Sequence, residues 1–109
     1  MTTTYRVLGQ TNPSANTLTT LYTVPSSTQT IVSSVTICNQ SSNTALFKLA
    51  VRPFGEAIDS KHYINFNTTL PGNDTISVKL GMTLGATDVI SVNVSSSSVS
   101  FSAFGSEIS

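Results

Sequence analysis

Alternation of apolar and polar residues recurs along almost the whole chain, and this feature restricts the fold most strongly. In the segment from Ala45 to Arg52, every second residue is apolar, and Lys48 and Arg52 occupy the intervening positions. Successive side chains of a β-strand point to opposite faces of a sheet, so this period predicts strands with one buried face. The same pattern recurs at Ile76, Val78 and Leu80, at Ile90, Val92 and Val94, and at Val99, Phe101 and Ala103.

Turn-forming residues separate the alternating segments. Asn12-Pro13-Ser14, the polar run 39–43 and Leu70-Pro71-Gly72-Asn73-Asp74 combine the fixed angles of proline, the freedom of glycine and side-chain turns of asparagine and aspartate. Such spacing predicts an all-β fold, a single antiparallel β-sandwich of about eight strands with jelly-roll or immunoglobulin-like topology. The sandwich is expected to span residues 1–109, with 1–4 as a flexible N-terminal arm and only a short helical turn around 55–61.

The composition argues against two classes of partner. Five Lys and Arg residues balance five Asp and Glu residues, and charged residues make up only 9% of the chain. Binding to nucleic acid needs clustered Lys and Arg for phosphate contacts, and adhesion to a membrane surface needs a polybasic segment. We therefore expect neither nucleic acid nor membrane as a partner. The start of the chain also lacks the charged and apolar regions of a signal peptide, which predicts assembly in a cytoplasm.

Residues that could support catalysis or metal binding are few. His62, the one histidine, could form a triad with Asp59 and a serine, but no Gly-x-Ser-x-Gly turn positions a nucleophile. The acidic residues are scattered singly, without the spacing of a glycosidase pair or a calcium loop. Cys38 near a strand end is expected to pack as a small apolar residue. The sequence predicts a non-enzymatic protein with no catalytic, cofactor-binding or metal-binding residues.

A surface with few charges favours association with other protein subunits. Serine and threonine account for 35 of the 109 residues, and hydroxyl groups can supply hydrogen bonds across a polar interface. Charged residues that normally protect strand edges from pairing are scarce here. We therefore expect a symmetric homo-oligomer. The expected partner contact is the polar start of the chain, Thr2, Thr3, Thr4 and Tyr5, which could add as a strand to a neighbouring subunit.

Several segments carry a resemblance to a known class of proteins. Leu21-Tyr22-Thr23-Val24-Pro25, the strand ending at Asn39, Phe47–Arg52, His62-Tyr63-Ile64 and the Gly81–Ile90 turn follow one another in a recurring layout. This layout, over roughly residues 5–107, resembles small β-sandwich virion proteins of tailed bacteriophages, such as capsid decoration (cement) proteins and tail or baseplate modules. The resemblance implies a non-enzymatic homo-oligomer, with a trimer favoured, that binds the major capsid protein, or alternatively tail proteins, in the virion.

A second class of function is a module that binds a host receptor or glycan. Such a module needs exposed aromatic rings on which a ligand can stack. The expected platform consists of Phe54, His62 and Tyr63, provided that these side chains are exposed and lie close together.

Overall fold

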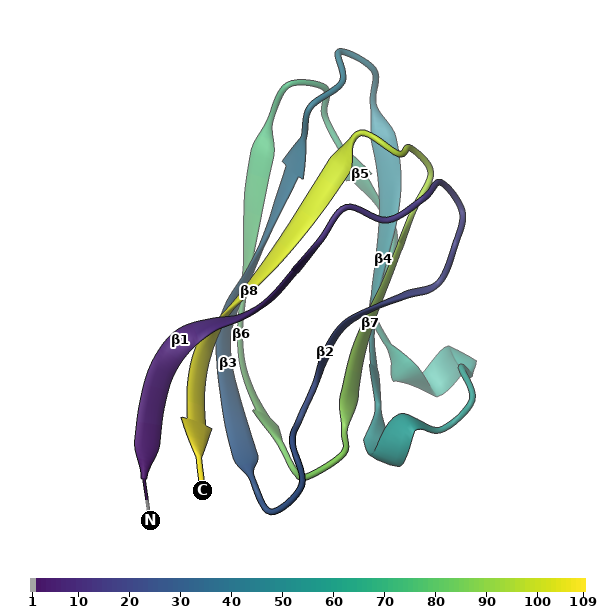
Figure 1. The fold of residues 1–109 in the computed structure, drawn as a ribbon. Coiled ribbons are helices and arrows are strands. Elements are labelled where there is room, and N and C mark those ends of the chain that lie inside the picture. The colour runs from purple at the N-terminus through teal and green to yellow at the C-terminus, as the bar shows by residue number, and fades with distance from the viewer. Residues whose placement is uncertain (1) are drawn as a thin grey trace.

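The computed structural model describes residues 2–109, which form eight β-strands and two three-residue 3₁₀ turns (Figure 1). The strands are β1 (Thr3–Thr11), β2 (Thr19–Thr23), β3 (Gln29–Asn39), β4 (Ala45–Arg52), β5 (Tyr63–Leu70), β6 (Thr75–Leu84), β7 (Val89–Val94) and β8 (Val99–Ile108). The turns η1 (Pro53–Gly55) and η2 (Ser60–His62) lie between β4 and β5, in the region where a short helical turn is expected. None of the helical segments in residues 2–109 is long and apolar enough to cross a membrane.

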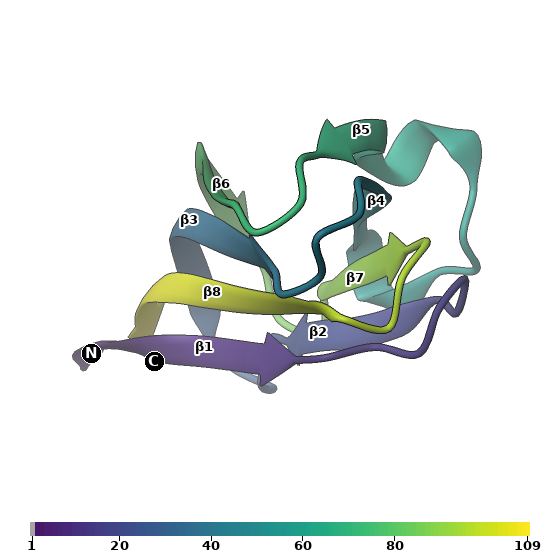
Figure 2. The same ribbon diagram turned by 90° about the horizontal axis from the view of Figure 1, so that it is seen from above.

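The strands form two four-stranded antiparallel sheets that pack face to face (Figure 2). The first sheet has the order β1-β8-β3-β6, and the second has the order β2-β7-β4-β5. The pairs β1–β8, β2–β7, β3–β6 and β4–β5 are nested within one another along the chain, as in a long hairpin rolled into a sandwich. This order is that of a jelly roll. The predicted all-β sandwich is confirmed, and its strand order excludes the immunoglobulin-like alternative.

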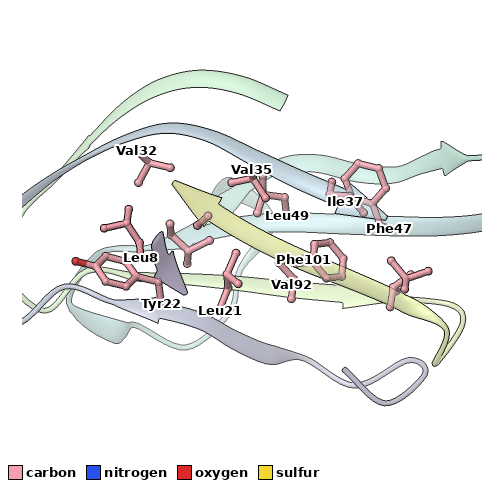
Figure 3. Packing of buried hydrophobic residues seen from close by; sticks show 14 of the residues in the cluster. Leu8, Leu21, Tyr22, Val32, Val35, Ile37, Phe47, Leu49, Val92 and Phe101 are labelled. Atoms are coloured by element: carbon pink, nitrogen blue, oxygen red, sulfur yellow. The ribbon is translucent and has the colours of Figure 1, made fainter. Parts of the chain in front are cut away.

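Alternating apolar side chains from both sheets fill the space between them (Figure 3). Phe47 of β4 and Phe101 of β8 are fully buried, and their ring centroids lie 6.2 Å apart in an edge-to-face arrangement. Burying each such side chain contributes about 1.5–3 kcal/mol relative to leaving it exposed. The residues predicted to point inward on β7 and β8 are also buried: Ile90, Val92, Val94, Val99, Phe101 and Ala103.

The start of the chain belongs to the sandwich, so the predicted flexible arm is wrong for residues 2–4. Thr3 pairs with Ile108 and Thr4 with Glu107 as the first residues of β1. Thr2 and Ser109 exchange two backbone hydrogen bonds, with N–O distances of 2.7 and 2.9 Å. Without a neighbouring strand, the backbone donors and acceptors on this side of β8 would be unpaired. Pairing with residues 2–4 satisfies them, which explains why these residues belong to the sheet. Met1 lies outside the described residues.

Candidate functional site

Two surface areas combine exposed apolar side chains with a strand at the edge of a sheet. The first area lies at β1, an edge strand of the first sheet, and the second lies at β5, an edge strand of the second sheet. Edge strands have unpaired backbone groups on one side, and exposed apolar patches often mark interaction sites. These two areas are therefore the candidate functional surfaces.

The area at β1 consists of Tyr5, Val7, Ile31 and Phe104, here called the β1 patch. Ser106 of β8 pairs with Tyr5 of β1 on one side and with Ile31 of β3 on the other. Val7 of β1 pairs with Phe104 of β8. Residues directly opposite in a sheet project to the same face, and residues two apart along a strand do so as well. The four side chains therefore share the outer face of the first sheet. Tyr5 is 83% exposed, which is far more than a tyrosine in a core or a closed interface.

The opposite face of the same strands holds a hydrogen-bonded network. The Tyr22 hydroxyl of β2 donates to Glu107 Oε2 of β8 and lies 2.8 Å from Thr30 Oγ1 of β3. Arg6 Nη1 of β1 lies 3.2 Å from Glu107 Oε1. Burial and the carboxylate of Glu107 raise the pKa of Tyr22 to about 12. This network fixes β1 and β8 to the second sheet, so it holds the β1 patch in place.

The area at β5 contains a shallow depression between β4, η2 and β5, here called the aromatic depression. Its volume is about 400 Å³, and it is lined by Lys48, Ile58, Asp59, Ser60, Tyr63 and Phe66. The rings of Tyr63 and Phe66 meet edge to face, with centroids 5.0 Å apart and planes at 79°. Lys48 Nζ lies 4.9 Å from the centroid of the Phe66 ring, which is within the range of a cation–π contact. Phe66 nevertheless remains 59% exposed.

Irregular pairing between β4 and β5 accounts for these exposed rings. Phe47 pairs with Thr68, Leu49 with Asn65, and Ala50 with Tyr63, so β5 contains extra residues on both sides of Asn65. Bulges of this kind bend a strand and redirect its side chains. Asn65 lies opposite the buried Leu49, and its Oδ1 is buried without a hydrogen-bond partner among the described residues. Phe66 is consequently on the outer face.

The predicted platform of Phe54, His62 and Tyr63 is wrong in its membership. His62 is only 5% exposed, and its ring joins two parts of the connection between β4 and β5. Its Nδ1 accepts from the backbone N–H of Asp59 at 3.1 Å, so Nε2 carries the proton toward Glu56 Oε1 at 3.2 Å. Phe54 is 77% exposed, but it does not line the aromatic depression. Of the three residues, only Tyr63 belongs there.

The residues that were candidates for catalysis or metal binding in the sequence make ordinary structural contacts. Both ring nitrogens of His62 are engaged by Asp59 and Glu56, and no serine hydroxyl within residues 2–109 forms a hydrogen bond to that ring. Among the described residues, no three His, Cys, Asp or Glu side chains gather where they could hold a metal ion. Cys38 is a free thiol of intermediate exposure on β3.

The sequence interpretation missed Phe66 and Lys48 as surface partners of Tyr63. Period-two alternation grouped Phe66 with His62 and Ile64, whereas Ile64 and Phe66 are exposed and His62 is buried. No signal in β5 alone marks its bulges, because a bulge is a property of the pairing with β4.

Comparison of the chain with protein-family models, curated proteins and solved structures finds no match. The functional argument therefore depends on the two surfaces and on the chemistry of their residues.

Proposed function

We propose that the protein is a non-enzymatic structural component of a bacteriophage virion. In its most concrete form, it is a capsid decoration protein that binds the outer capsid surface as a homo-oligomer, with a trimer favoured. The alternative within this class is a tail, baseplate or fibre component. Assembly takes place in the host cytoplasm, and the partners are further copies of the chain and the major capsid protein.

The β1 patch is the observation that supports this proposal most strongly. Tyr5 and Val7 are exposed on a strand whose outer edge has no partner within the described chain. Only Arg6 brings a charge to β1, and its guanidinium is paired with Glu107 on the inner face. Exposed apolar side chains beside free backbone donors and acceptors suit association with another protein subunit.

The proposed mechanism is mechanical. A rigid sandwich that contacts neighbouring capsomers adds buried area between them, and this area resists the outward pressure of packaged DNA. The contact uses the β1 edge in place of a flexible arm, so Thr2–Thr4 contribute as part of a preformed strand. A preformed strand loses less conformational entropy on binding than a disordered segment does.

Copy number in purified particles tests the proposal. Quantitative mass spectrometry of particles from the virus that encodes the chain would give its ratio to the major capsid protein. A ratio near one, or near one third, is expected for a protein that covers the whole lattice. A few copies per particle would contradict the decoration role and support a tail component. Complete absence from the particles would overturn the virion proposal.

A further inference from the structure

The aromatic depression is a preformed site in a part of the molecule that the proposed assembly contact does not use. Asp59 begins η2 as its N-cap, and its carboxylate accepts from the backbone N–H of Ser60 at 2.7 Å. The buried His62 ring ties the end of η2 back to Asp59 and to Glu56. These contacts fix the connection that contributes Ile58, Asp59 and Ser60 to the lining, and β4 and β5 contribute the other lining residues. A site with fixed walls binds a small ligand at low entropic cost.

The polar groups that line the depression are free to bind a ligand. The Lys48 ammonium forms no ion pair with a carboxylate in residues 2–109, although it rests above the Phe66 ring. The Asp59 carboxylate caps η2, where it accepts from the backbone N–H groups of Ser60 and His62, and it is exposed, so its remaining lone pairs can accept from a ligand. An ammonium donates three hydrogen bonds, and a carboxylate accepts several. Donors and acceptors therefore surround two aromatic rings.

We propose that the aromatic depression binds a sugar ring. A pyranose has an apolar face of C–H groups, which can lie against the ring of Phe66 or Tyr63, and hydroxyl groups that both donate and accept hydrogen bonds. Asp59 accepts from two neighbouring hydroxyls, and Lys48 and Ser60 donate to others. This combination of an aromatic surface with a few placed polar groups is typical of small-molecule sites.

The charged groups of the depression favour a sugar over a cationic ligand and over a purely apolar ligand. A cationic ligand would be repelled by the Lys48 ammonium, which already forms a cation–π contact with Phe66. A purely apolar ligand would cover Lys48 and Asp59 and leave both charges without hydrogen-bond partners, which is unfavourable. A sugar hydroxyl replaces the water that each of these groups would lose.

A glycan array probed with the full chain, followed by nuclear magnetic resonance titration with the best-bound oligosaccharide, tests this proposal. We expect binding in the millimolar range or tighter. Phe66→Ala removes the stacking surface and should weaken binding by at least about tenfold. Lys48→Met keeps the apolar stem, removes the donor and should also weaken binding. Phe54→Ala is the matched control, because it removes an exposed aromatic ring outside the depression.

Other results of these experiments would contradict the proposed sugar site. An array without bound oligosaccharide overturns the proposal, and so does equal affinity for Phe66→Ala and the unmodified chain. A similar loss in Phe54→Ala would also overturn it, since the sugar would then bind elsewhere. Because Phe66 is exposed, its replacement should leave the fold intact, which circular dichroism checks. The copy number in particles is independent of these outcomes, so failure of this site leaves the virion proposal unaffected.

Discussion

At the scale of single residues, Tyr22 joins three strands through one hydroxyl group. Its ring packs with the core, and its oxygen lies at the edge of that cluster (Figure 3). There it contacts Thr30 and Glu107, which belong to the other sheet. A hydrogen bond to a charged group is stronger than one between neutral groups, and partial burial of this bond reduces its screening by water. Tyr22 therefore stabilises the packing of the two sheets at this end of the sandwich.

We predict that stability falls in alkaline solution and that Tyr22 contributes to this fall. Its pKa is raised from the ordinary value of 10.0 to about 12, first by burial and then by its hydrogen bond to Glu107. Above the ordinary value, the unfolded chain loses the phenolic proton while the folded chain keeps it. The contribution is therefore complete below about pH 10 and lost as the pH rises through about 12.

Urea unfolding followed by circular dichroism at about pH 9 and about pH 11.5 measures this effect. Tyr22→Phe should lower the free energy of unfolding at neutral pH by about 1 kcal/mol and should show a smaller alkaline loss than the unmodified chain. Tyr5→Phe, which changes an exposed ring, is the control. An alkaline loss of the same size in Tyr22→Phe would contradict the prediction.

At the scale of single elements, β8 depends on a glycine where it passes the bulge of β3. Gly105 lies opposite Val32, and the register between β3 and β8 shifts just beyond this pair. A Cβ atom at Gly105 would lie 2.0 Å from the carbonyl oxygen of Ile31. That oxygen belongs to the backbone of a central strand pair, so it cannot move away without distorting both strands.

Gly105→Ala should therefore lower the free energy of unfolding by about 1–3 kcal/mol, as expected for overpacking. Gly85→Ala is the matched control, because its nearest neighbour would be Asp88 Oδ2 at 3.8 Å, an ordinary contact. Thermal and urea unfolding of the two variants give the comparison. Equal stability of both variants would show that the strand pair can adapt to the added methyl group.

The strands themselves could largely be predicted from the sequence, but of the two candidate surfaces only Tyr5 and Tyr63 could. Alternation identified the inward residues of β4 and β7, such as Phe47 and Val92, because one face of these strands is regular along its length. The same reasoning failed on β5, where bulges opposite β4 place Phe66 outside. It also failed at Thr3, whose partner Ile108 is at the other end of the sequence. Register and edge pairing depend on the neighbouring strand, which local periodicity does not describe.

At the scale of the whole molecule, the surface offers little charge to oppose association. The net charge is zero, and the β1 patch lies at the edge of the first sheet. Proteins with net charge near zero associate more readily than strongly charged ones. β1 lies at one end of its sheet beside β8, and only its C-terminal end comes close to β2 (Figure 2). The oligomeric state should therefore depend on this edge.

Two lysines in the β1 patch should convert the proposed homo-oligomer to a monomer. The double variant Tyr5→Lys and Val7→Lys introduces charges at exposed positions, as natural edge strands do, and should leave the melting temperature of each subunit nearly unchanged. The control variant, Thr20→Lys with Thr23→Lys, adds the same charge at exposed positions of β2. Analytical ultracentrifugation distinguishes the states. A monomeric unmodified chain, or a double variant that stays oligomeric, would contradict the prediction.

The position of β8 also determines when the molecule can fold during its synthesis. β8 lies between β1 and β3, yet it is the last strand of the sandwich to leave the ribosome. Until then, β1 has no partner in its own sheet, and β3 has only β6. Pairing strands so distant in sequence is slow, because a long loop must close first. The nascent chain therefore carries unpaired strands until β8 has been made, and chaperones that shield such edges would act in this interval.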